Sequence, residues 1–211
     1  MASKENIRKE LEEVLLTYEK PSTYFKKLKE ENKLKEIYPE INDLIDVIQS
    51  PIHHPEGDVF NHTMMVIDEA AKLKNKSHNP LGFMYAALCH DFGKVLTTTT
   101  KEDGKIISYN HERAGLKLVR RFLNETTKKE EKNLREYILN MTELHMQPNQ
   151  LANQNSKSKS TRKLFNKSIC PDDLVLLAKA DALGRTVNQD YSPKEEYLKN
   201  ALKDFYNNKE N

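Results

Sequence analysis

The stretch YAALCHDFGK, residues 85–94, decides the fold, because it joins a helical apolar stripe to two adjacent polar side chains. Counting back from His90 by three, four and seven residues finds alanine, alanine and phenylalanine, so a helix here directs the imidazole toward the core. A single buried histidine is commonly a hydrogen-bonded core residue. Asp91 is harder to explain, because a buried carboxylate is costly to desolvate without a cation or several donors. The dipeptide alone supports a metal site and a satisfied core pair about equally.

Four further apolar stripes carry the same kind of polar side chain. His62, for example, is followed by valine, alanine and leucine four, eight and eleven residues later, which is helical spacing. The other stripes contain His111, His145 and Asp181. Any one of them could be a satisfied core residue, but five coincidences in one small domain are better explained by convergence on a metal ion.

The ligand types narrow the choice of metal. Four imidazoles and two carboxylates without a thiolate suit one or two divalent ions, namely Mn, Fe, Co, Ni, Mg or catalytic Zn. Six ligands leave both one ion and two ions open. Cys89 and Cys170 have no CxxC partner, so each is expected to be a small buried hydrophobe in a reducing compartment.

Composition indicates one domain. The 211 residues are 31% charged and 37% hydrophobic, without tryptophan. We expect an N-terminal helical segment (1–50), a core (51–187) and a C-terminal helix (188–211). No secretory apolar core and no stretch of roughly 18 apolar residues occurs, so we expect a cytoplasmic protein without a membrane partner.

Net charge does not indicate a nucleic-acid binder, because it is only +2. Two local basic clusters are interpreted as solvated faces, with phosphate contact as the alternative. The first contains Lys117, Arg120, Arg121, Lys128 and Lys129, and the second contains Lys157, Lys159, Arg162, Lys163 and Lys167.

The periodic segments predict an all-α chain with one short β-hairpin near residues 96–108, where LTTTT and IISY flank the turn KEDGK. The polar run 149–160 is expected to be a mobile connection that gates the site. Apolar surfaces on the first two helices pack either on the domain or on a second copy in a homodimer. Helices are expected over residues 3–18, 22–31, 40–48, 61–75, 80–92, 111–125, 129–145, 159–166, 171–187 and 193–208.

Several neighbours of the ligand set are candidates for supporting roles. Either Glu56 or Asp58, in HHPEGD, is expected to hydrogen-bond a ligand histidine, whereas direct ligation by His53 or His54 is disfavoured. Glu112 is assigned to the same surroundings or to substrate contact. Arg185, one turn beyond Asp181, is expected to pair with that carboxylate rather than to bind phosphate.

The order His62, His90-Asp91, Asp181 resembles the HD superfamily of metal-dependent phosphohydrolases. A closer resemblance, from about residue 20 to residue 185, is to the C-terminal HD domain of bacterial CCA-adding tRNA nucleotidyltransferases. It rests on KPSTYFKKLKE, IYPEINDLI, HHPEGDVFNHTMMVID, AALCHDFGK, HERAGLKLV and ADALGR. The resemblance implies an HD-domain helical bundle in which His62, His90, Asp91 and Asp181 are the core metal ligands, while His111 and His145 match positions that hold a second ion. Lys94 matches the lysine of the HDxGK motif.

Two departures from that family limit which of its properties are expected for this sequence. The paired Asp-x-Asp motif of the nucleotidyltransferase half does not occur in this sequence, so we expect a stand-alone HD domain without nucleotide addition. Asn110 stands where relatives usually have glycine before the His-Glu pair.

The resemblance implies an enzyme, a divalent-metal-dependent phosphodiesterase and phosphatase. Its substrates would be 2',3'-cyclic nucleotides or RNA 3' ends, with tRNA as a candidate partner. Asp91 is assigned to orient the attacking water, and Lys94 to neutralise charge on the phosphoryl group. One alternative is a nucleoside 5'-monophosphatase or deoxynucleotide phosphohydrolase of the same superfamily. Another is a non-catalytic tRNA or RNA-end binding module, against which the intact ligand set argues.

Overall fold

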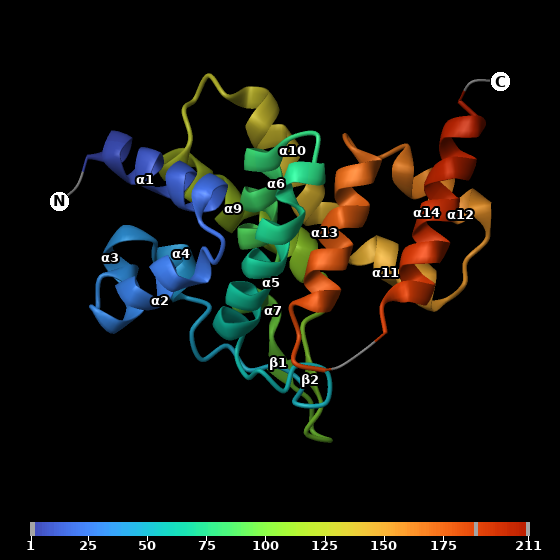
Figure 1. The fold of residues 1–211 in the computed structure, drawn as a ribbon. Helices are drawn as coiled ribbons and strands as arrows, with labels where there is room; N and C mark the ends of the chain where they lie inside the picture. The colour runs from blue at the N-terminus through green and yellow to red at the C-terminus, as the bar shows by residue number, and fades with distance from the viewer. Residues whose placement is uncertain (1–2, 188–189, 210–211) are drawn as a thin grey trace.

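Four helices form the centre of the protein in the computed structural model, which describes residues 3–187 and 190–209. They are α5 (Val59–Leu73), α6 (Pro80–Cys89), α10 (Lys132–Leu144) and α13 (Pro171–Leu183). Helix α6 packs against α5, α10 and α13, and α13 packs against α5 (Figure 1). Every residue of α6 from position 82 to position 89 is buried, as expected for a helix that is apolar on all sides.

The N-terminal helices cover one side of this centre. They are α1 (Lys4–Thr17), α2 (Ser22–Glu30), α3 (Leu34–Ile37) and α4 (Pro39–Asn42). Helix α1 packs against α6 and α9 (Leu116–Thr126), burying Leu11, Val14 and Leu15, and α2 packs against α5. The apolar faces of the first two helices are therefore covered within one chain.

The C-terminal helices lie on the opposite side in Figure 1. Helices α11 (Met146–Asn153), α12 (Ser158–Phe165) and α14 (Ser192–Asn207) pack against one another, and α11 also packs against α13. The run 149–160, expected as a mobile connection, is therefore mostly helical, and that prediction is wrong. Leu151 and Ala152 pack against the core, and this apolar contact decides the local structure more than the polar composition does.

The predicted hairpin is confirmed. Strands β1 (Thr99–Thr100) and β2 (Ile106–Ile107) pair antiparallel, with Thr99 opposite Ile107. Gly104 has φ +80°, the left-handed conformation that such a turn requires. The hairpin follows α7 (Lys94–Thr97) and extends from one end of the helical bundle in Figure 1. The all-α class with one short hairpin is thus the observed fold.

Three predicted helices differ from the observed ones, and one of them, expected over 171–187, already ends at Leu183 as α13. The segment 111–125 is divided into α8 (His111–Ala114) and α9 at Gly115, where the chain meets Gly93. A Cβ on Gly93 would lie 1.8 Å from the carbonyl oxygen of His111, so only glycine allows this approach. The segment 40–48 is helical only to Asn42, and Asp46 adopts φ +62°.

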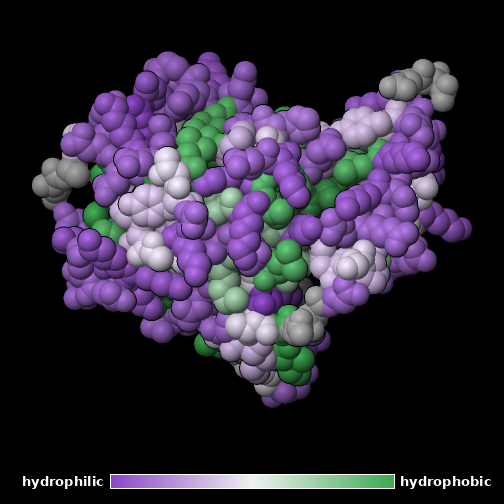
Figure 2. Space-filling view, viewed as in Figure 1, coloured by the Kyte–Doolittle hydropathy of each residue, from purple (hydrophilic) through white to green (hydrophobic). Residues whose placement is uncertain are grey.

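Two further sequence expectations concern the limits of the three predicted segments and contact with a membrane. The expected segment limits at residues 1, 188 and 211 lie outside the described residues. Among the described helices, none is long and apolar enough to cross a membrane. Figure 2 shows a mostly hydrophilic face, with hydrophobic patches around the end that carries the hairpin.

Candidate metal centre

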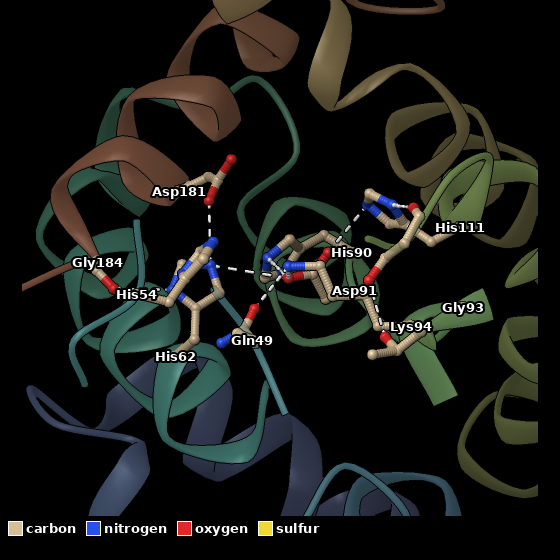
Figure 3. A network of polar contacts seen from close by, with 12 residues as sticks. Gln49, His54, His62, His90, Asp91, Gly93, Lys94, His111, Asp181 and Gly184 are labelled. Carbon is tan, nitrogen blue, oxygen red and sulfur yellow. Dashed lines mark hydrogen bonds and ion pairs between the residues drawn. The ribbon is translucent and has the colours of Figure 1, made fainter. Parts of the chain in front are cut away.

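The six predicted ligand residues converge on one buried place. Their exposed fractions are between 0% and 5% of the reference areas. His62 lies in the first turn of α5, His90 and Asp91 follow α6, His111 begins α8, His145 follows α10, and Asp181 lies in the last turn of α13. Five separate helix ends therefore supply the site, and Figure 3 shows several of these side chains pointing toward one another.

The start of α5 is fixed by Asp58. Its Oδ1 accepts a hydrogen bond from the backbone N–H of Asn61 (2.8 Å), and its Oδ2 accepts one from the N–H of Asp46 (2.9 Å). Asp58 was one of two candidates for holding a ligand histidine directly. Instead it caps the helix that carries His62, and it acts on the site only through that helix.

Three of the histidines are oriented in the same way. The Nδ1 atom of each donates to the backbone carbonyl oxygen three residues earlier, at 2.8 Å for His90, 2.8 Å for His111 and 2.7 Å for His145. A proton on Nδ1 leaves the lone pair on Nε2, which faces the centre. This arrangement is the usual one for metal-bound imidazole, whose second nitrogen is held by a backbone or carboxylate acceptor.

His62 is oriented by groups that lie farther away in the sequence. Its Nδ1 lies 3.0 Å from both the carbonyl oxygen of Gly184 and the Oε1 atom of Glu56, and its Nε2 lies 3.1 Å from Asp181 Oδ1. Glu56 also contacts Nδ1 of His54 at 2.8 Å. Glu56 therefore occupies the supporting position that the sequence predicted for it.

Asp91 lies between two groups of ligand atoms. Its Oδ1 is 3.1 Å from His111 Nε2 and 3.8 Å from His145 Nε2. Its Oδ2 is 3.2 Å from His90 Nε2 and 3.7 Å from His62 Nε2. Two triads can thus each hold an ion, with ligand atoms within 4.8 Å of one another: His62, His90 and Asp181 in the first, and Asp91, His111 and His145 in the second.

The electrostatics favour a cation at this centre. Burial alone would raise the pKa of Asp91, but electrostatic interactions and hydrogen bonds with His90, Lys94 and His111 hold that pKa well below its usual range. Asp181 is likewise buried, and Arg185 and His62 hold its pKa well below the usual range. Nε2 of His90 is buried and, among the described residues, has no hydrogen-bond partner. Two ionised carboxylates and inward imidazole lone pairs fit a divalent ion.

Lys94 and Arg185 bring positive charge to the edge of the centre. Lys94 Nζ lies 2.7 Å from Asp91 Oδ2 and donates to Gln49 Oε1 at 2.7 Å. Arg185 Nη2 lies 3.2 Å from Asp181 Oδ1, the pairing that the sequence predicted. A cavity of about 250 Å³ opens over these residues, and His53 and His54 also line it.

Gln49 was missed by the sequence analysis. It lies in the irregular segment between α4 and α5, and it holds no position in an apolar stripe that would have drawn attention to it. His54 was considered only as a disfavoured ligand, yet its ring packs edge-on against His62 with the centroids 4.7 Å apart. Both contacts depend on how this segment folds back over the helices.

The remaining candidates lie at the margin or elsewhere. Glu112 Oε2 is 3.8 Å from His111 Nδ1, whose hydrogen bond goes to a backbone oxygen instead. Arg121 pairs with Glu40, and Arg162 pairs with Asp204. Among the residues that the structure describes, no member of either basic cluster lines the cavity over the candidate metal centre.

A second group of metal-ligand residue types, away from the centre, has a structural explanation. It consists of His78, Cys170 and Asp173. The carboxylate of Asp173 accepts hydrogen bonds from the backbone N–H of His78 (3.0 Å) and from the hydroxyls of Ser77 (2.8 Å) and Tyr137 (2.5 Å). Its oxygens are therefore already satisfied. Cys170 is only partly buried, unlike Cys89, and burial raises the pKa of its thiol to about 11.

Comparison with known proteins identifies the class of this chain. The HD domain family matches residues 59–186, which include all six residues of the two triads, and the chain belongs to that family. Its superfamily consists of metal-dependent phosphohydrolases, as the sequence motifs predicted. The HD domain is a divalent-metal-binding domain, in agreement with the His and Asp groups described above.

Relatives within the family narrow the similarity further. The multifunctional CCA protein of Actinobacillus pleuropneumoniae serotype 5b is 34% identical over 173 residues, covering 78% of this chain and 40% of the relative. The multifunctional CCA protein of Mannheimia succiniciproducens is 32% identical over 197 residues, covering 89% of this chain and 45% of the relative. The predicted resemblance to CCA-adding enzymes is thus confirmed, and the chain spans less than half the length of these relatives.

Proposed function

We propose that this protein is a divalent-metal-dependent phosphohydrolase that cleaves 2',3'-cyclic phosphodiesters on nucleotides or RNA 3' ends and removes terminal phosphates. The observation that carries the proposal is Asp91, whose two oxygens face two different ligand groups, with His111 on one side and His90 on the other. A carboxylate shared in this way supports a two-metal site, which is the arrangement that suits phosphoester hydrolysis.

In this proposal the six candidate ligands form two metal sites. His62, His90 and Asp181 would hold one ion, and Asp91, His111 and His145 the other. Ions bound there would supply an activated water and would polarise the phosphoryl oxygens. Mn, Fe, Co, Ni, Mg and Zn all suit this ligand set.

Lys94 would bind the phosphoryl group of the substrate, and Arg185 adds positive charge beside it. Both line the cavity and both are already paired with carboxylates of the centre, so their positive charge is held at its edge. Charge that develops on the phosphoryl oxygens can therefore be stabilised without movement of the backbone. Gln49, which accepts a hydrogen bond from Lys94, would fix the direction of the ammonium group.

The domain organisation and partners form part of the proposal. Helices α1 and α14 both pack on helices of the central group or on their immediate neighbours, which supports one HD domain over the described residues. The relatives are named as CCA proteins, which supports tRNA 3' ends as one candidate substrate. A cytoplasmic location agrees with such a substrate.

The proposal is tested by metal analysis of untagged protein combined with hydrolysis of adenosine 2',3'-cyclic phosphate. Wild-type protein is expected to carry divalent metal and to hydrolyse the cyclic phosphate, whereas Asp91→Ala loses both. His78→Ala is the matched control, because this exposed histidine lies outside the cavity. Activity retained by Asp91→Ala refutes the mechanism.

Two alternatives give different results in the same assay. A nucleoside 5'-monophosphatase or deoxynucleotide phosphohydrolase would hydrolyse its own substrates faster than the cyclic nucleotide in a substrate panel. A non-catalytic RNA-end binding module would hydrolyse none of them with Mn, Ni or Co. The six buried ligand residues argue against the binding module, since their desolvation would be uncompensated without a cation.

A further inference from the structure

A second cavity adjoins the cavity over the metal centre. It has a volume of about 140 Å³, and the cavity over the centre has about 250 Å³. Both are lined by Met146, Asp181 and Arg185, so these three residues form a shared wall. Neither volume alone reaches the roughly 300–1,000 Å³ of typical small-molecule sites, but the two together do. A ligand that extends past the candidate metal centre could occupy both.

The shared wall offers a donor to a ligand in the second cavity. Nη2 of Arg185 is 3.2 Å from Asp181, whereas its Nε is buried and lacks a hydrogen-bond partner among the described residues. The Arg185 side chain as a whole is 26% exposed and lines both cavities. Its guanidinium group can therefore contact a phosphate group while Nη2 keeps its bond to Asp181.

The far side of the second cavity adds another cation. Lys194, in the first turn of α14, lines it and forms no ion pair within residues 3–187 and 190–209. The neighbouring cations of α14 and α13 behave differently, since Lys179 and Lys199 both pair with Glu195. Lys194 and Arg185 thus face one cavity, and this pair of cations suits a phosphodiester.

Amide side chains complete the lining. Asn149 is used structurally, because its Nδ2 donates to the Ala178 carbonyl oxygen at 2.7 Å and its Oδ1 accepts from the Tyr191 hydroxyl at 3.1 Å. Gln150 and Asn153, on the same helix, are exposed and line the cavity. An amide offers both a donor and an acceptor, which matches the edge of a nucleobase or a ribose hydroxyl, whereas a polyphosphate offers acceptors only.

We propose that this second cavity is a subsite for the nucleotide that precedes the reacting one, so that the enzyme prefers oligonucleotide ends to mononucleotides. The inference rests on the proposed phosphohydrolase function and specifies its substrate class. Lys194 and Arg185 would bind the phosphodiester that joins the two nucleotides, and Gln150 and Asn153 would contact the sugar or base.

The test compares kcat/KM for adenosine 2',3'-cyclic phosphate with kcat/KM for a diadenosine dinucleotide that ends in the same cyclic phosphate. Wild-type protein is expected to prefer the dinucleotide, and Lys194→Ala to reduce the dinucleotide-to-mononucleotide ratio about tenfold, as for one lost charged hydrogen bond. Lys203→Ala, an exposed lysine on the same helix outside the cavity, is expected to keep the wild-type ratio. A wild-type ratio near one, with metal-dependent hydrolysis of both substrates, overturns the subsite and leaves the proposed function standing.

Direct binding separates the two proposals when no hydrolysis is seen. The affinity of a fluorescent diadenosine 3'-phosphate, measured by anisotropy, is expected to fall in Lys194→Ala and not in Lys203→Ala. Equal affinity in wild type and Lys194→Ala overturns the subsite. If Lys194→Ala weakens binding of deoxyadenosine triphosphate but not of the dinucleotide, the second phosphate belongs to a polyphosphate, and the oligonucleotide proposal is wrong.

Discussion

Nδ1 of His62 lies 3.0 Å from the carbonyl oxygen of Gly184, although 122 residues separate them in the sequence. This contact ties the start of α5 to the end of α13, so a metal-ligand candidate is oriented by the helix end that follows Asp181. The helices meet closely enough there that a Cβ on residue 184 would lie 2.8 Å from backbone atoms of Val66.

Substituting Gly184 by alanine is expected to destabilise the protein. The added Cβ would lie 2.5 Å from Val66 Cγ2 and 2.8 Å from Val66 Cα, so the two helices must separate. We expect a loss of about 1–3 kcal/mol in the free energy of unfolding, as for other overpacked cores. Urea denaturation in the presence of a chelator measures it. A midpoint and slope equal to those of wild type would show that the contact is not tight.

Replacing Glu56 is expected to weaken metal binding without removing a ligand. Glu56 Oε1 is 3.0 Å from Nδ1 of His62, and loss of such a support costs about 10–100-fold in metal affinity. Glu56→Ala should show this loss in calorimetric titration with Mn²⁺, and Glu56→Gln, which keeps an acceptor, should recover part of it. Glu69→Ala, on the outer part of α5, is the control and should bind as wild type does. Equal affinities in all variants would exclude a supporting role.

The two triads predict different metal contents for two ligand variants. His145→Ala removes a ligand from one triad only, so we expect one ion per chain instead of two. Asp91→Ala removes the carboxylate that faces both groups, so we expect less than one ion per chain. Elemental analysis after equilibration with Mn²⁺ measures both. Two ions in His145→Ala would contradict the assignment of that triad.

Metal removal is expected to lower the thermal stability of the wild-type protein. A metal that binds only the native state stabilises it by about 2.7 kcal/mol at a free concentration one hundred times Kd. Chelation should therefore lower the Tm of wild type, and re-addition of Mn²⁺ should restore it. Asp91→Ala should not respond to either treatment, whereas His78→Ala should respond as wild type does.

The sequence was sufficient to select the six candidate ligands that the structure brings together, because they share a strong local signal. His62, His111 and Asp181 lie within helices, and His90 and His145 come directly after one, so helical spacing indicates where each side chain points. Lys94 and Arg185 could be placed for the same reason, since each lies about one turn from a ligand. The helix ends at Gly115 and Gly184 were not predicted, because tertiary contacts with Gly93 and Val66 determine them.

What the sequence could not provide depends on segments without periodicity. Gln49 and His54 lie between α4 and α5, where no pattern predicts the direction of a side chain. The run 149–160 was predicted as a polar connection, yet most of it is helical, and Leu151 and Ala152 pack against the core. Residues of α11 line the second cavity, and the polar composition of this helix had led to the prediction of a connecting segment instead.

The local hydrogen bonds of His90, His111 and His145 have a consequence for the order in which the site forms. Each imidazole is oriented by a carbonyl only three residues away, so the orienting hydrogen bonds of His111 and His145 lie wholly within residues 108–145. The other triad must wait for Asp181 and Gly184. During synthesis from the N-terminus, the residues of one triad are therefore made first, and the other triad is complete only after α13 has been made.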